Sequence, residues 1–285
     1  MSKCPDMLKQ IADININSGV NKSNLPIIKM ILLGIMAGAF IALGGTASNV
    51  ASFGVENAGL QRVIAGCLFP VGLMMVVFSG SELFTGNCLM IVGVLDKKVK
   101  FNKMLINLVV VFFSNLIGAL IVDFLIFYSG QLDIGSGAVG AYAIKIAVAK
   151  TTISPLKAFT SGILCNIFVC MAIVMSCVAK EISGKILAIF FPIFAFVVCG
   201  FEHSIANMFY IPMGILSATN PQYTQVANDL YGITLGQSNN LLSFSGIDSI
   251  IYVTLGNIVG GMLFVGIPFY LAHRKVWGKQ PKRHI

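Results

Sequence analysis

Two similar stretches of sequence decide the fold: Gly80-Ser81-Glu82-Leu83-Phe84-Thr85-Gly86-Asn87 and Gly200-Phe201-Glu202-His203-Ser204-Ile205-Ala206-Asn207. Both follow the pattern G-x-E-x-x-x-x-N, and both lie inside apolar segments that are too long for a single membrane crossing. One crossing by a helix needs about 20 apolar residues. Polar residues in the middle of such long segments predict that two membrane helices are broken near their centres.

The composition agrees with a membrane protein. The 285 residues are 56% hydrophobic and 11% charged, and the mean hydropathy is +0.87. A soluble domain has about 25% charged residues. So few charges cannot cover a surface that faces water, and the composition also excludes disordered, collagen-like and disulfide-stapled chains. The seven cysteines contain no C-x-x-C pair and are interpreted as small buried hydrophobic residues.

Six apolar segments are predicted, at 26–50, 63–95, 104–129, 155–179, 184–216 and 248–272. The net charge of +8 comes from basic residues between these segments, which is typical of topology determinants and not of nucleic-acid binding. Lys and Arg are concentrated on the side of the N-terminus. We therefore expect one transmembrane domain spanning 1–285 in the cell (inner or plasma) membrane, with a cytoplasmic N-terminal segment 1–25, a membrane core 26–272 and a basic cytoplasmic tail 273–285.

The two halves of the chain are related to each other. Asn115 and Gly118 in the third segment match Asn257 and Gly260 in the sixth, and a proline precedes each broken region. Because each half has three spans, an odd number, the second half is predicted to be inverted in the membrane. Inverted repeats with one broken helix in each half are typical of transporters. Unpaired backbone is costly in lipid, so both breaks are expected to face a shared path near the membrane midplane.

Few ionisable side chains lie within the apolar segments, and each is a functional hypothesis by default. Glu82 and Glu202 occupy equivalent repeat positions. They are either ion or proton sites, or they accept hydrogen bonds from backbone N–H groups freed by the breaks; the repeat favours this second, structural role. Asp123, late in the third segment, is interpreted as structural.

His203 has no counterpart in the first half, where Leu83 stands at the matching position. This asymmetry favours a functional role, and the neutral-range pKa of histidine suits hydrogen-bond or proton donation. Lys150 has two open interpretations: an ordinary interfacial lysine, or a charge that draws an anion to the mouth of a path.

Uncharged residues complete the predicted path. Thr85 and Asn166 supply hydrogen-bonding groups. Four apolar side chains, which otherwise would only pack in the bundle, are candidates for constrictions: Leu73, Leu83, Phe84 and Phe196.

Other functional classes find little support in the sequence. The sequence contains no H-E-x-x-H, G-x-S-x-G or Walker A motif, and no cofactor or metal is predicted. An intramembrane enzyme built on Glu202 and His203 would lack a nucleophile or metal cluster. A structural or receptor-like membrane protein would not need two matched helix breaks.

Four motifs, in order and at the right spacing, make the chain resemble the formate/nitrite transporter family: the runs 80–87 and 200–208, Ala149-Lys150-Thr151-Thr152, and Cys165-Asn166. The resemblance implies an aquaporin-like six-helix fold, a homopentamer with one pore per protomer, and passage of formate, nitrite or hydrosulfide. It also implies the pore residues His203, Glu202, Thr85, Lys150 and Asn166, and constrictions at Leu73, Leu83 and Phe196.

These observations lead to a single functional hypothesis, a channel for formate or a similar small monovalent anion. In this hypothesis Lys150 attracts the anion, Leu83 and Phe196 form one constriction and Leu73 the other. His203, held by Thr85, donates a hydrogen bond or a proton, so that the substrate crosses as the neutral acid. Nitrite and hydrosulfide remain alternatives, because the predicted pore chemistry is nearly the same for all three.

Overall fold

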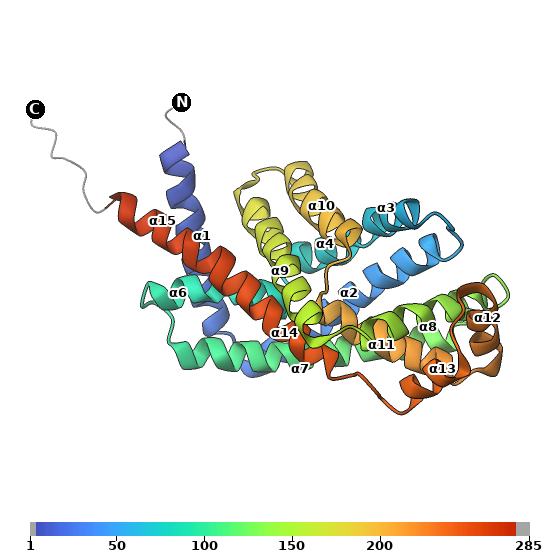
Figure 1. Cartoon of the computed structure of the whole chain (residues 1–285). Coiled ribbons are helices and arrows are strands. Elements are labelled where there is room, and N and C mark those ends of the chain that lie inside the picture. The colour runs from blue at the N-terminus through green and yellow to red at the C-terminus, as the bar shows by residue number, and fades with distance from the viewer. Residues whose placement is uncertain (1–3, 278–285) are drawn as a thin grey trace, which may run out of the picture.

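The computed structural model describes the backbone of residues 4–277 and the side chains of residues 10–272, and every regular element in this range is helical (Figure 1). Six stretches are long and apolar enough to cross a membrane: Ile27–Ser52, Ala58–Ser79, Phe101–Tyr128, Pro155–Val178, Ile182–Cys199 and Ser249–Ala272. They confirm the six predicted segments. Four boundaries agree within a few residues, whereas the second and fifth predicted segments, 63–95 and 184–216, also contain the shorter apolar helices Phe84–Leu95 and Ser204–Ala218.

The second and fifth spans are broken where the sequence predicts. The second span consists of α3 (Ala58–Leu68) and α4 (Pro70–Ser79), and it resumes after the break as α5 (Phe84–Asn87), η1 (Cys88–Met90) and α6 (Ile91–Leu95). The fifth consists of α10 (Ile182–Cys199) and α11 (Ser204–Ala218). The apolar second parts are too short to cross a membrane by themselves.

The two halves also repeat the same helix packing and the same close backbone contacts. In the first half α2 (Ile27–Ser52) packs along α7 (Phe101–Tyr128), and in the second half α9 (Pro155–Val178) packs along α14 (Ser249–Val259). A Cβ atom added at Gly118 would overlap the carbonyl oxygen of Ile35, and one added at Gly260 would overlap that of Ile163. Glycine therefore permits the same backbone approach at equivalent places in both halves.

One element breaks this equivalence. The sixth span contains a π-helix, η3 (Gly260–Gly266), between α14 and α15 (Ile267–Trp277), whereas α7 is a continuous α-helix. A Cβ added at Gly261 in this segment would lie 2.6 Å from Nδ2 of Asn166 and 2.8 Å from Cβ of Cys88. The sixth span thus approaches the first break closely.

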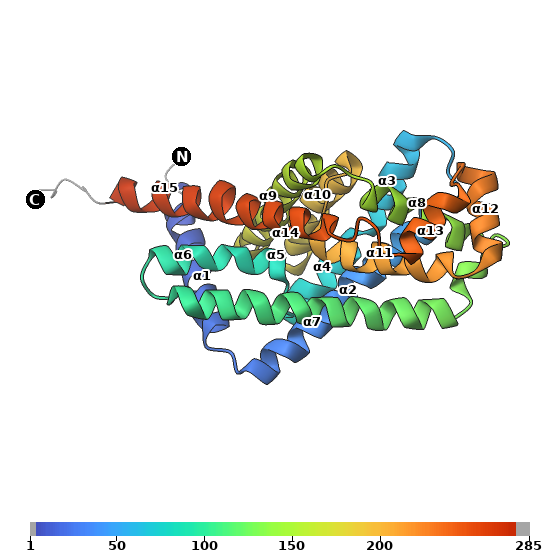
Figure 2. The same cartoon turned by 60° about the horizontal axis from the view of Figure 1, so that its bottom comes forward.

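Several shorter helices lie outside the spans and were not predicted: α1 (Cys4–Ser23), η2 (Gln131–Asp133), α8 (Ala138–Thr151), α12 (Pro221–Tyr231) and α13 (Leu235–Leu242). α1 packs against α6, η1 and α9, while α8 packs against α11 and α12. In both views α1 and α15 lie at one end of the molecule and α12 and α13 at the other (Figures 1 and 2). Both ends of the described chain thus lie on one side, as an even number of crossings requires.

Candidate functional site

Each break is formed by a glycine and stabilised by an asparagine. Gly80 and Gly200 end their helices in the left-handed conformation, with φ of 69° and 73°, which glycine adopts without strain. Beyond the first break, the N–H of Phe84 donates to Oδ1 of Asn115 at 3.0 Å. Beyond the second, the N–H of Ser204 donates to Oδ1 of Asn257 at 2.9 Å.

The same two asparagines also donate to backbone carbonyls. Asn115 donates to the carbonyls of Glu82 and Gly34, at 2.9 and 2.8 Å, and Asn257 donates to those of Glu202 and Gly162, at 3.1 and 2.8 Å. Both amides are completely buried. They satisfy backbone groups that the breaks leave without helical partners, which is why polar backbone is tolerated at this depth.

The expected role of the two glutamates in accepting backbone N–H bonds is wrong. In the described part of the chain, the carboxylate of Glu82 accepts from Lys22 and Asn87, both at 2.7 Å. Glu202 accepts from Lys150 at 2.8 Å and from Asn207 at 2.7 Å. Because the asparagines already satisfy the backbone, each carboxylate is free to pair with a lysine.

Lys22 is a candidate site residue that the sequence analysis missed. It lies in the last turn of α1, as Lys150 lies in the last turn of α8. Each lysine forms an ion pair with the glutamate of its own half. The signal was present in the sequence, because Lys22, Lys29 and Gly34 have the same spacing as Lys150, Lys157 and Gly162. The repeat therefore includes the helix that precedes each half.

His203 lies at the second break and connects it to the first. Its Nε2 atom is 3.0 Å from Oγ1 of Thr85, and its Nδ1 atom accepts the N–H of Ala206 at 3.1 Å. A backbone N–H can only donate, so Nδ1 carries no proton and the ring is the neutral tautomer with hydrogen on Nε2. The imidazole thus caps α11 with one nitrogen and presents a donor to Thr85 with the other.

A second layer of side chains holds Thr85. Asn166 donates from Nδ2 to the Thr85 carbonyl at 3.2 Å and to the Asn257 carbonyl at 2.6 Å. The thiol of Cys170 lies 3.6 Å from the same Thr85 carbonyl. Since Asn166 and Thr85 are both completely buried, the position of the threonine hydroxyl depends on α9 as well as on the break.

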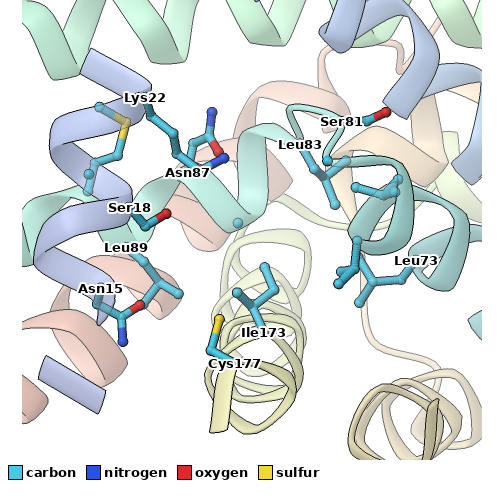
Figure 3. Close-up of a pocket in the computed structure, with 16 residues that line it drawn as sticks. Asn15, Ser18, Lys22, Leu73, Ser81, Leu83, Asn87, Leu89, Ile173 and Cys177 are labelled. Atoms are coloured by element: carbon cyan, nitrogen blue, oxygen red, sulfur yellow. The ribbon is translucent and has the colours of Figure 1, made fainter. Parts of the chain in front are cut away.

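Two cavities that have no lining residue in common lie near this layer: one is lined by Leu83 and Gly86, close to Thr85 in the chain, and the other by His203. The Lys22 cavity, of about 160 Å³, is lined by α1, α4, the first break and α9, with Lys22, Leu73 and Leu83 among its residues (Figure 3). The Lys150 cavity, of about 260 Å³, is lined by Lys150, Glu202, His203 and apolar side chains that include Phe69 and Phe196. The rings of Phe69 and Phe196 meet edge to face, with centroids 5.7 Å apart.

The structure places the predicted constriction residues differently from the expected grouping. Leu83 lies with Leu73 on the Lys22 cavity, and Phe196 lies on the other cavity. Phe84 lines neither and packs against Phe112 of α7, with ring centroids 5.1 Å apart. Asp123 also lies apart from both cavities; it is completely buried, and within the described residues neither carboxylate oxygen has a hydrogen-bond partner.

The structure has two matched helix breaks, a hydrogen-bonded group of His203, Thr85 and Asn166 where they meet, and a cavity on each of two sides, the Lys22 cavity and the Lys150 cavity, which we also call vestibules. These features define a membrane transport protein built from inverted repeats. The chain belongs to the formate/nitrite transporter family, whose sequence pattern matches residues 9–271. This membership confirms the resemblance found in the sequence and the prediction of a multi-pass membrane transport protein instead of an enzyme.

Similar proteins agree with this family. A probable formate transporter of Methanothermobacter thermautotrophicus is 39% identical over 274 residues, which cover 89% of this chain and 92% of that protein. The formate channel FocA of Haemophilus influenzae is 37% identical over 257 residues, covering 88% and 89%. A solved structure of a pentameric formate channel with formate bound superposes with a TM-score of 0.77 at 33% identity, covering 87% of this chain and 98% of that one.

Proposed function

We propose that this protein is a channel for formate and similar small monovalent anions. The observation that carries the proposal is the His203–Thr85 pair, 3.0 Å apart, near two cavities, of which one is lined by Lys22 and the other by the Lys150–Glu202 ion pair. Relatives named as formate channels, at 32 to 37% identity, support formate as the substrate. The family name also covers nitrite, which is the alternative substrate, with hydrosulfide as a third anion to test.

The proposed path runs from one vestibule to the other past His203. Lys150 and Glu202 make one of these vestibules, the Lys150 cavity, polar, and Lys22, which is paired with Glu82, does so in the other, the Lys22 cavity. Leu73 and Leu83 narrow the path before the polar layer, and Phe196 narrows it beyond. Asn166 holds the Thr85 backbone, and this keeps the Thr85 hydroxyl beside the imidazole of His203.

A bare anion would lose several kcal/mol of hydration in a narrowing lined by leucine and phenylalanine. We infer that formate takes up a proton from vestibule water and crosses this region as neutral formic acid. His203 supplies a hydrogen bond from Nε2 and not the proton, because its Nδ1 already accepts the Ala206 N–H and the ring is neutral. Each formate transported would then carry one proton with it.

The proposed assembly is a homopentamer in the cell membrane, with one pore per protomer and both termini in the cytoplasm. The similar solved structure of a pentameric formate channel supports the assembly, and the concentration of basic residues on one side supports the orientation. Native mass spectrometry of the protein in detergent measures the assembly directly: a stable monomer or trimer would contradict it.

The function is tested by reconstituting the purified protein into liposomes and measuring uptake of formate, nitrite and hydrosulfide, each at several concentrations. Protein-free liposomes give the leak of each neutral acid, which is the necessary control. We expect saturable formate flux well above the leak. Saturable flux of nitrite or hydrosulfide without formate flux would support the alternative substrate, and no flux of any of them would contradict the proposal.

A further inference from the structure

Arg62 places a guanidinium group beside the second break although it belongs to the first half of the chain. It is exposed on α3, and its Nη1 lies 3.5 Å from the carbonyl oxygen of Val198. A Cβ atom at Gly200 would lie 3.5 Å from the same nitrogen. The guanidinium therefore lies next to the residues that lead into Glu202 and His203.

The charged side chains that line the Lys150 cavity do not cancel one another. The positive charge of Arg62 has no carboxylate partner among the described residues. The charged side chains lining this cavity are Arg62, Lys150 and Glu202. Lys150 is neutralised by Glu202 at 2.8 Å and also lies over the ring of Tyr210. Among the described residues no carboxylate lies within ion-pair distance of Arg62, so the cavity keeps one positive charge.

The next basic residue along α8, Lys145, does not line this cavity. Its ammonium group lies over the rings of Tyr142 and Tyr231, at 5.3 and 4.6 Å from their centroids, and burial lowers its pKa. A guanidinium, in contrast, presents a planar fork of N–H donors that matches both oxygens of a carboxylate.

A second polar group on the same cavity has no hydrogen-bond partner among the described residues. Asn49 of α2 is only 7% exposed and lines the cavity, yet its amide makes no hydrogen bond to any described residue. Its neighbour Ser52 donates to the Ser48 carbonyl at 2.7 Å. Because Asn49 lines the cavity, its amide is available to a ligand or water there.

We propose that Arg62 and Asn49 form a carboxylate-binding site in the Lys150 cavity, which captures a small monovalent carboxylate before it reaches His203. The choice of formate as the carboxylate rests on the proposed function. Arg62 binds both oxygens of the carboxylate, and Asn49 of α2 donates one N–H to it. The Lys150–Glu202 pair then acts as a neutral wall and not as the main attraction for the anion.

The site is tested with Arg62→Gln, Arg62→Lys and Asn49→Ala in oriented liposomes, measuring formate flux from each side at low and high ionic strength. Lys157→Gln is the matched control, because Lys157 is an exposed cation at the start of α9 that lines neither cavity. Saturation-transfer NMR of the formate proton, with each protein in detergent, measures binding independently of flux.

For formate entering from the Lys150 side, Arg62→Gln should raise KM about 3- to 10-fold at low salt and less at high salt, with kcat unchanged. The KM of Arg62→Lys should lie between those of Arg62→Gln and the unaltered protein, because lysine keeps the positive charge but lacks the planar pair of N–H donors. Asn49→Ala should raise KM by a similar amount at all salt concentrations. An unchanged KM in all three, or an equal shift in Lys157→Gln, would overturn the proposal.

The two proposals fail in different ways. If the unaltered protein carries no formate but binds it, and Arg62→Gln loses that binding, then the proposed function is wrong and the carboxylate site stands. If the unaltered protein carries formate and the Arg62 and Asn49 variants match it in flux and binding, then the site is wrong and the function stands.

Discussion

The imidazole of His203 makes two hydrogen bonds with opposite roles, and together they fix its protonation. Nδ1 accepts from the first turn of α11, and Nε2 faces the hydroxyl of Thr85. A protonated ring would have to give up the bond to Ala206 and hold a charge at 3% exposure. At the scale of the residue, His203 is therefore a fixed hydrogen-bond donor.

Replacing His203 by Phe removes the Nε2 donor and the Nδ1 acceptor while keeping an aromatic ring. We expect saturating formate flux to fall about 10- to 100-fold, the size expected for losing a hydrogen bond to a charged or polar substrate in a dry site. Loss of the helix cap should lower stability by about 1 kcal/mol. Liposome flux and thermal unfolding measure the two effects; full flux in a correctly assembled variant would contradict the role of His203.

Because Lys150 and Glu202 form an ion pair, we expect a single substitution to lower stability more than the double substitution does. Glu202→Gln leaves Lys150 partly buried without its carboxylate. Breaking a buried ion pair costs about 3–5 kcal/mol, and because the side chains keep 15% and 12% exposure we expect about 2–3 kcal/mol. Adding Lys150→Met to Glu202→Gln should recover part of this loss, since no charge remains to be paired.

Thermal unfolding of the two single variants and the double variant in detergent tests this coupling. If the two losses simply add, the lysine and glutamate do not stabilise each other in the folded protein. The corresponding comparison with Lys22 and Glu82 is a natural control, because Lys22 is more exposed, at 25%, and the same coupling should be smaller there.

At the scale of the element, the geometry of the proposed path depends on how closely the spans approach each other. α2 meets α7, and α9 meets α14, at glycines that let one backbone touch the other. The asparagines that support the breaks, Asn115 and Asn257, project from α7 and α14. Close packing of the spans therefore sets the position of the breaks, and through them the position of Thr85 and His203.

Gly118→Ala tests this dependence. The added methyl would overlap the carbonyl oxygen of Ile35, a backbone atom that cannot rotate away. We expect a loss of stability at or above the upper end of about 1–3 kcal/mol typical of overpacking. Gly54→Ala is the matched control, since a Cβ there meets nothing within 4 Å. A thermal unfolding temperature equal in the two variants would contradict the role of close approach.

At the scale of the whole molecule, the proposed passage of a neutral acid sets how flux responds to pH and voltage. At pH values above the pKa of formic acid, the concentration of the neutral acid falls about tenfold for each pH unit. Formate flux at low concentration should therefore fall steeply between pH 5 and pH 7. A bare anion would show no such fall, and a membrane potential would drive it with about 2.3 kcal/mol per 100 mV.

Clamping the liposome potential with potassium and valinomycin separates these two cases. We expect formate flux that is independent of the potential and accompanied by acidification on the receiving side. Flux that follows the applied potential, with no change in internal pH, would mean that the anion itself crosses.

The sequence by itself determined the membrane class, the number of spans and the place of both breaks. These are properties of local composition: long apolar runs, polar interruptions and repeated glycines act within one segment. It also identified His203, Thr85, Lys150 and Asn166 as candidates, because polar residues in apolar surroundings stand out. Their roles in transport stay predictions.

Only the tertiary structure decided which groups meet. The partner of Glu82 lies 60 residues away on a helix within 1–25, a range that the sequence analysis described only as a cytoplasmic N-terminal segment. Leu83 joined Leu73 instead of Phe196, and Arg62 reached the break of the other half. The physical reason is that ion pairs and cavity walls form between segments brought together by helix packing. A one-dimensional pattern records that a charge is present, whereas the fold alone decides which charge it faces.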